Sequence, residues 1–397
     1  MNRRLAPKGW DPIAGLWKLF CALAILVGHH LVTYIEWREP SGLVRGVYQL
    51  LQVVSPLHFF FFSGWLAASG LVDIRRPMAG LFANRFLRIY VLVVFALSWG
   101  LLWRVAMMPW TGDGSLGTIW PLGSWDRPIS WDEILRHLSP AGFADSIRYN
   151  YASWYLYQEL RLVFLFPVFR WILRRSAMRS WILIAAVWLT GSVGEYFFWA
   201  SFPGFRTSPF QTLAYASILL CGARLKLDLP LVAALSWPSK LLLVASGLVL
   251  TSLEAFGIRP PIDNPGVLLL PTLVGQLALV AGLATLPGRV RWPWFAEFAN
   301  RWSVGIYVVH PPVHMAFAWL AIREDRSWLL FASIPIGFLL GVLFHHAVEN
   351  PLHNPLRRLV AGMEQRFQAS RVRSWWPKGK LDSRDVAKAP DRSSGKG

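Results

Sequence analysis

The most regular feature of the chain is a series of long apolar runs separated by mostly short polar connections. Many runs approach the roughly twenty residues that an α-helix needs to cross a bilayer. Ten helical spans are predicted, at residues 13–35, 47–71, 89–108, 154–173, 181–199, 210–225, 241–256, 267–286, 304–322 and 329–348. Because a helix satisfies its own backbone hydrogen bonds inside lipid, the pattern predicts an all-α, polytopic transmembrane bundle.

Composition supports a chain that is solvated by a bilayer. Hydrophobic residues make up 54% of the 397 residues and charged residues only 16%, which exceeds what one soluble core can hide. The first apolar run is too long for a signal-peptide core and lacks a cleavage site, so it is expected to be a retained span. Cys21 and Cys221 both lie in apolar runs, so neither a disulfide framework nor a metal site is expected.

The net charge of +18 could indicate nucleic-acid binding, but its distribution follows alternate connections between spans. One set of connections is strongly basic, and it contains Arg3, Arg4, Lys8, Arg75, Arg76, Arg85, Arg88, Arg174, Arg175, Arg179, Arg224, Lys226, Lys240, Arg289, Arg291, Arg301, Arg357 and Arg358. The other set balances bases with acids. The positive-inside rule therefore places both termini in the cytoplasm, and no nucleic-acid partner is expected.

The domain organisation follows from these spans. Residues 1–12 are expected to form a cytoplasmic segment, 13–350 the ten-helix membrane domain, and 351–397 a basic cytoplasmic tail that is partly disordered. The only long connection, the outer loop at 109–151, is rich in Gly, Pro, Trp and Asp without a helical period. It is large enough to cap a cavity or contact an outside partner.

The first span carries two polar residues where they are costly. A charged side chain near the bilayer centre costs at least about 2.5 kcal/mol. Lys18 and His29 are eleven residues apart, which is about three helical turns, so they share one face roughly 16 Å apart, while His30 points elsewhere. A cation toward the cytoplasm and a titratable base further out fit a cleft that crosses the membrane. Alternatively, Lys18 reaches the inner headgroups and His29 only bonds a neighbouring helix.

The second and third spans add a packing motif and a basic pair. Ser63 and Gly64 interrupt an aromatic run and are expected to allow close helix approach. Arg85 and Arg88 lie three residues apart on one helical face at the cytoplasmic rim. Paired guanidinium groups suit phosphate recognition, but the same pair could fix orientation or bind lipid phosphate.

Three later helices also carry ionisable groups at or inside apolar segments. Glu159 could form an ion pair with an arginine such as Arg88, and His310 could bond a neighbouring backbone, so structural and catalytic roles both stay open. Glu349 lies where the last span is expected to end at the membrane interface.

The order of these motifs along the chain resembles that in acyltransferase family 3. Members of that family modify extracytoplasmic sugars, glycolipids and some secondary metabolites. The positions that carry the resemblance are Lys18 with His29, Phe61 to Gly64, Arg85 with Arg88, Trp154 with Glu159, Ser303 with Tyr307 and His310, and Glu349 with Pro351. Two positions depart from the family pattern. Lys18 replaces a frequent arginine and so loses bidentate phosphate geometry but keeps its charge, and Val91 occupies a region where the family often has proline.

The resemblance implies transfer of an acyl group, often acetyl, from cytosolic acyl-CoA to a hydroxyl of an extracytoplasmic carbohydrate or glycolipid, in the bacterial cytoplasmic membrane. Arg85 and Arg88, together with Lys18, would hold the donor phosphates. His29 would be the general base, and Glu159 is the other candidate catalytic residue. An acyl-histidine intermediate is a less favoured variant. The acceptor, the acyl group and the oxyanion stabiliser stay open.

Two other function classes remain possible. A transporter or flippase would also place charges along a path through the membrane, although the sequence shows no inverted repeat or paired broken helices. A noncatalytic scaffold would account for the tail and the outer loop but not for His29.

Overall fold

The computed structural model describes residues 12–38, 42–73, 76–107, 129–139, 150–201, 208–253, 265–285, 293–356 and 358–362. Its helices are α1 (Pro12–Arg38), α2 (Gly42–Val72), α3 (Met78–Met107), α4 (Trp131–Leu138), α5 (Ser153–Phe164), α6 (Phe166–Leu173), α7 (Ala177–Ser201), α8 (Pro209–Ala233), α9 (Trp237–Ser252), α10 (Pro265–Thr285), α11 (Pro293–Arg323), α12 (Ser327–Phe344) and the π-helical turn η4 (His345–Glu349). The described residues contain no strand. The prediction of an all-α fold is confirmed.

Each of the ten predicted spans overlaps a helix, and the fourth is divided. Leu165 separates α5 from α6, because Pro167 has no N–H to donate to the carbonyl of Val163. Among the described residues, five helical stretches are long and apolar enough to cross a membrane, at Ala14–Arg38, Met78–Met107, Ala177–Phe198, Phe298–Arg323 and Ser327–Gly362. Leu57–Val72, Trp237–Ser252 and Leu273–Thr285 are shorter apolar helices. The orientation of the termini stays a prediction, since residues 1–11 and 363–397 lie outside the described residues, as do Arg75 and Arg289.

The outer surfaces of several helices are apolar. Large side chains such as Ile182, Leu189 and Phe197 on α7, and Leu339 and Leu343 on α12, are more than half exposed. Contiguous apolar surface of this kind is unfavourable in water and favourable against lipid. The buried side chains lie between the helices, so the polar groups described below are enclosed by the bundle.

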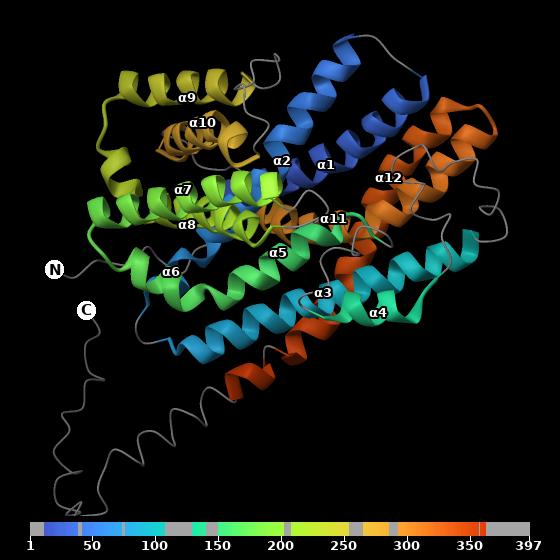
Figure 1. The fold of residues 1–397 in the computed structure, drawn as a ribbon, viewed down its shortest axis with the longest axis horizontal. Coiled ribbons are helices and arrows are strands. Elements are labelled where there is room, and N and C mark those ends of the chain that lie inside the picture. The colour runs from blue at the N-terminus through green and yellow to red at the C-terminus, as the bar shows by residue number, and fades with distance from the viewer. Residues whose placement is uncertain are drawn as a thin grey trace, which may run out of the picture.

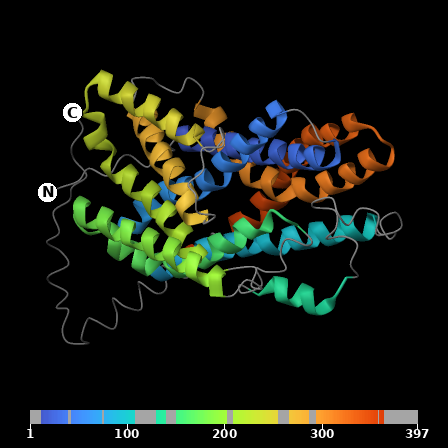
Figure 2. The same ribbon diagram turned by 45° about the horizontal axis from the view of Figure 1, so that its top comes forward.

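The helices pack as neighbouring pairs. α1 contacts α11 and α2, α11 contacts α12, α2 contacts α8, and α8 contacts α7. In Figure 1, α9 and α10 lie beside α7 and α8 at one end, and α1, α11 and α12 occupy the other end. The turned view in Figure 2 keeps α3 along the side of the bundle. α3 contacts α5 and α11, and α2, which contacts both α1 and α8, connects the two groups.

Close backbone contact joins α2 to α8. A Cβ atom at Gly64 would overlap the carbonyl oxygen of Leu219, and one at Gly222 would overlap the carbonyl oxygen of Phe61. Only glycine fits at either position, because any larger residue would force the helices apart. The predicted close approach at Gly64 is confirmed.

The connection at 109–151, predicted to be an outer loop, contains a helix that was not expected from the sequence. In α4, Trp131 and Leu135 are exposed, whereas the Tyr90 hydroxyl of α3 donates to the Leu138 carbonyl at 2.9 Å and the Tyr157 hydroxyl of α5 donates to the His137 carbonyl. α4 therefore lies against the side of the bundle, as Figure 1 shows. The expectation of a loop without helical period is wrong over this stretch; residues 109–128 and 140–149 lie outside the described residues.

The sequence predicts that the last helix ends near Glu349, but in the structure it continues beyond that residue. It passes from α12 through η4 and remains helical over residues 350–356 and 358–362. A π-helical turn carries one more residue per hydrogen-bonded ring than an α-helix and often occurs at functional sites. Here the turn holds His345 and Glu349 inside the bundle, where both are buried.

Candidate functional site

A cluster of charged side chains, the charged cluster, is formed by Lys18, Arg85, Arg88, Glu159 and Glu349. They come from α1, α3, α5 and η4, and Lys18 interacts electrostatically with each of the other four. Arg85 Nη2 lies 2.5 Å from Glu159 Oε2, and Arg88 Nη2 lies 3.1 Å from Glu349 Oε1. The suggested partnership of Glu159 with Arg88 is therefore wrong, because Arg85 pairs with Glu159 and Arg88 pairs with Glu349.

Two hydroxyl groups fix the first ion pair. The Tyr155 hydroxyl donates to Glu159 Oε1 at 2.7 Å, and Arg85 Nη2 donates to Ser63 Oγ at 3.1 Å. Ser63 Oγ also lies 3.1 Å from the Tyr155 hydroxyl. Tyr155 was not anticipated from the sequence, although it precedes Glu159 by four residues and therefore shares its helical face.

A histidine supports the second ion pair. His345 Nδ1 lies 2.9 Å from Glu349 Oε2, so the two oxygens of Glu349 have different partners, His345 and Arg88. Both His345 and Glu349 belong to η4 and lie four residues apart. The π-helical turn thus presents a buried carboxylate to α3.

The charged cluster contains more cations than carboxylates. Its three basic residues face two acidic ones, and Lys18 makes no ion pair or hydrogen bond with any residue that the structure describes, although its side chain is only 7% exposed. Burying a charge is costly unless a counter-charge compensates it. The cluster therefore has the charge balance expected of a site that receives an anion.

A second group, the histidine cluster, comprises His29 and His30 of α1 and His310 and His314 of α11, with Tyr151 beside them. His29 Nδ1 lies 2.9 Å from His310 Nε2, and the two rings stack at 5.2 Å. The ring of Tyr151 meets His29 edge-on at 4.5 Å. His29 is partly exposed, whereas the other three histidines are fully buried.

The two remaining histidines have separate partners. His30 bonds the Leu26 carbonyl at 2.5 Å and contacts Ser333 Oγ. His314 Nδ1 lies 2.8 Å from the Tyr151 hydroxyl, and its Nε2 lies 3.2 Å from Thr33 Oγ1. Within the described residues, no group of three His, Cys, Asp or Glu side chains is arranged to hold a metal ion. The polar contacts of these histidines are hydrogen bonds to neighbouring protein groups.

His314 was missed by the sequence interpretation, but a signal for it exists. Tyr307, His310 and His314 follow one another at intervals of three and four residues, which places them on one face of α11. That face packs against α1. The polar residues of α11 therefore lie on a face that packs against the face of α1 with Lys18 and His29.

Two consecutive prolines lie inside α11 directly after His310. Pro311 and Pro312 have no N–H, so the carbonyls of Tyr307 and Val308 lose their helical donors. Asn150 Nδ2 donates to the Val308 carbonyl at 2.9 Å, which replaces one of them. Trp99 Nε1 donates to the next carbonyl, that of Val309, at 3.0 Å. The end of the connection at 109–151 is thus attached to α11 next to the histidine cluster.

The other motif positions lie between or beside the clusters. The Tyr307 hydroxyl donates to the Ala152 carbonyl at 2.7 Å, and its ring lies 5.4 Å from that of Tyr155. Trp154 packs against Tyr215 at 5.8 Å. Ser303 Oγ donates to the Asn300 carbonyl at 3.0 Å in its own helix. Tyr307 is therefore the motif residue that bridges the two clusters, and Ser303 and Trp154 have local contacts.

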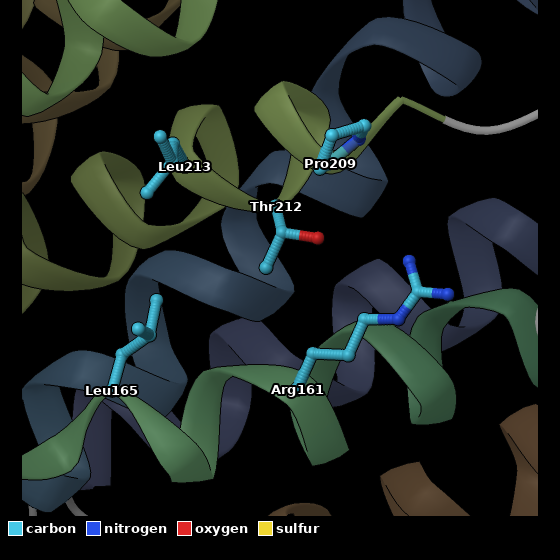
Figure 3. Close-up of a pocket in the computed structure, with 5 residues that line it drawn as sticks. All are labelled: Arg161, Leu165, Pro209, Thr212 and Leu213. Atoms are coloured by element: carbon cyan, nitrogen blue, oxygen red, sulfur yellow. The ribbon is translucent and has the colours of Figure 1, made fainter. Parts of the chain in front are cut away.

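A pocket of about 400 Å³ lies between α5 and α8, lined by Arg161, Leu165, Pro209, Thr212 and Leu213 (Figure 3). Arg161 is two residues beyond Glu159, which turns it about 200° around α5. The pocket therefore opens on the other side of α5 from the charged cluster.

Comparison with known proteins identifies the chain by family. A family described as an acyltransferase domain, the acyltransferase family 3 to which the motifs are similar, matches residues 15–346. No match is found among curated proteins or among solved structures. The matched region includes both clusters except Glu349, which lies three residues beyond it. With its apolar membrane-length helices, the chain belongs to acyltransferase family 3 and is a multi-pass membrane acyltransferase.

Proposed function

We propose that this protein transfers an acyl group, acetyl by preference, from cytosolic acyl-CoA to a hydroxyl of an extracytoplasmic carbohydrate or glycolipid, with His29 as the general base. The observation that carries the proposal is the arrangement on α1: Lys18 belongs to a cluster with excess positive charge, and His29, about three turns further along the same face, is hydrogen-bonded to His310. Family membership supports the reaction class.

The charged cluster suits the donor. Acyl-CoA carries phosphate groups, and guanidinium and ammonium groups are the usual partners of phosphate. Arg85 and Arg88 are partly exposed, with side-chain exposures of 25% and 35%, so their remaining N–H groups are available to a ligand at the cluster. Lys18 would supply the charge that the two carboxylates do not neutralise.

His29 suits the acceptor half of the reaction. It would accept the proton of the acceptor hydroxyl as that oxygen bonds the thioester carbonyl carbon. The carbon–sulfur bond then breaks, and the departing coenzyme A thiolate takes up a proton. His29 is partly exposed, whereas the other three histidines are fully buried.

The proposal is tested on the cell envelope, where the acceptor occurs. Envelope glycans and glycolipids from a strain that lacks the gene would be analysed by mass spectrometry after complementation with wild type, His29→Ala or, as an exposed-histidine control, His346→Ala. We expect an acyl substituent to be present with wild type and His346→Ala and lost with His29→Ala. An unchanged acyl profile in the deletion strain would contradict the proposal, and altered export of an unmodified glycan would instead favour a flippase.

The sidedness is tested separately. A cysteine at position 115, in the part of the outer loop outside the described residues, should react with an impermeant reagent in intact cells or spheroplasts, because charge bias places this loop outside. Reaction only after lysis would reverse the orientation and with it the assignment of donor and acceptor sides.

A further inference from the structure

His310 is held in one orientation by its own helix. It is completely buried, and its Nδ1 lies 3.0 Å from the carbonyl oxygen of Ile306. The Cα atom of Gly337 on α12 faces it, and a Cβ atom there would lie 3.3 Å from His310 Cβ. The small residue lets α12 close over the histidine, so the ring has little freedom to turn.

These contacts fix the tautomers of both rings. A carbonyl oxygen can only accept, so His310 Nδ1 carries the hydrogen, and in a neutral imidazole the other nitrogen, Nε2, is then an acceptor. His310 Nε2 faces His29 Nδ1 at 2.9 Å, so His29 Nδ1 must donate. It follows that Nε2 is the unprotonated nitrogen of a neutral His29.

The surrounding groups leave this assignment unchanged. Within the part of the chain that the structure describes, the titratable groups seen to face His29 are His30 on α1, His310 and His314 on α11, and Tyr151. His30 bonds the Leu26 carbonyl and contacts Ser333, and His314 bonds Tyr151 and Thr33. Among these groups, His310 is the one whose ring nitrogen faces a ring nitrogen of His29.

We propose that His310 is a positioning residue: its Nε2 accepts the hydrogen of His29 Nδ1 and so holds His29 Nε2 as the atom that takes the acceptor proton. The inference rests on the proposed role of His29 as general base. When His29 becomes an imidazolium, its Nδ1–H still donates to His310, so the bond persists through the proton transfer and strengthens as charge develops. Partners that orient metal-ligating histidines typically change activity about 10- to 100-fold, and we expect a loss of that order here.

A pair of amide variants separates this role from packing. In His310→Gln, the amide oxygen reaches about as far as Nε2 and can still accept from His29. In His310→Asn, the shorter side chain can bond the Ile306 carbonyl but does not reach His29. Both are polar and smaller than histidine, so a purely structural role predicts similar losses from both.

The direct readout needs no acceptor. Diethyl pyrocarbonate modifies unprotonated imidazole nitrogens, and peptide mass spectrometry would give the modification rate of His29 in purified full-length protein, with the exposed His346 as internal reference. We expect His310→Asn to slow modification of His29 relative to wild type and His310→Gln to remain near wild type. Equal rates in the Asn variant and wild type, or in Asn and Gln, would overturn the inference.

Kinetics provide the second readout. Thiol release from acetyl-CoA would be measured in membranes of the producing strain, which contain the native acceptor. We expect His310→Asn to lower kcat with little change in the KM for acetyl-CoA, and to have no further effect in a His29→Ala background, because residues that act as a unit are not additive. If His29→Ala itself retained turnover, the proposed base would be wrong, whereas the modification rates would still decide whether His310 orients His29.

Discussion

The two polar clusters solve the problem of burying polar groups in different ways. In the charged cluster, ion pairs join different helices, Arg85 with Glu159 and Arg88 with Glu349. Lys18 forms no ion pair with the described residues. The histidine cluster contains imidazoles of α1 and α11 and the phenol of Tyr151, two residues before α5, and these groups hydrogen-bond one another. The charged cluster thus contains ionised side chains, whereas the histidine cluster contains neutral hydrogen-bond donors and acceptors.

This difference indicates a division of labour. An ion pair with a cation in excess is suited to hold an anion without moving a proton, because arginine stays charged. A chain of neutral imidazoles is suited to move a proton without holding a charge at rest. Mutations should therefore separate binding from turnover along the same bundle, and the following predictions test that separation.

The largest effect is expected from His29→Ala. A positioned general base contributes about 10² to 10⁴-fold, so turnover should fall by that factor with folding and donor binding largely kept. Thiol release from acetyl-CoA in membranes and thermal unfolding of the purified variant measure the two properties. Turnover within about threefold of wild type would be far too small a loss for a general base and would refute this role.

The matched control for His29→Ala is His30→Ala. From the sequence alone, a mild effect is expected because His30 points away from the Lys18 face. In the structure, His30 is fully buried and bonds the Leu26 carbonyl, so the variant should lower the free energy of unfolding by about 1–3 kcal/mol while the turnover of the folded fraction stays near wild type.

The next largest effect concerns Arg85. Removing one partner of a buried ion pair costs about 3–5 kcal/mol because the other charge stays buried, and Glu159 is only 5% exposed. Arg85→Ala should therefore destabilise the protein strongly, and Arg85→Ala with Glu159→Gln should recover much of that stability. Donor affinity should remain weakened in the double variant if Arg85 binds the donor phosphates.

Thermal shift with and without acetyl-CoA distinguishes these contributions. Full recovery of donor affinity together with stability would show that Arg85 serves only the fold. Extending the comparison, Arg85→Ala with Arg88→Ala should weaken donor binding further, and an unchanged affinity in that variant would remove the charged cluster from the donor site.

A smaller effect is expected where the outer loop meets α11. Asn150→Leu removes the donor to the Val308 carbonyl, which Pro312 has already deprived of its helical partner. A buried acceptor left unsatisfied costs about 1–3 kcal/mol, so the melting temperature should fall while donor binding in the charged cluster is unchanged. A loss of donor affinity instead would show that the two clusters are not separable.

The sequence predicts the helices and the polar faces well, for physical reasons that act locally. Membrane-length apolar runs define the spans, and the eleven-residue interval places Lys18 and His29 on one face of α1. Gly64 also predicts structure locally, because a small residue within an aromatic run usually indicates close helix packing.

Partners across helices were less predictable. Whether Glu159 meets Arg85 or Arg88 depends on the rotation of α3 against α5, and both arginines share one face, so spacing cannot choose between them. The continuation of the last helix was missed because Pro351 suggests an end, whereas the π-helical turn η4 precedes it. α4 was missed although Trp131, Ile134, Leu135 and Leu138 follow a helical period, since Gly and Pro dominate the rest of its loop.

The smallest effect is expected from substitution of Lys18, and it tests whether the charged cluster has a cation for the donor. Since Lys18 forms no ion pair with the described residues, Lys18→Met removes an uncompensated buried charge and should leave stability equal or slightly higher. Donor affinity should fall about tenfold, which corresponds to about 1.4 kcal/mol. Lys18→Arg should restore it, because the charge returns and guanidinium also binds phosphate. Calorimetry with acetyl-CoA measures affinity, and thermal unfolding measures stability. A destabilised Lys18→Met with unchanged donor affinity would mean that Lys18 neutralises Glu159 and Glu349 for the fold, and the charged cluster would then have no cation reserved for the donor.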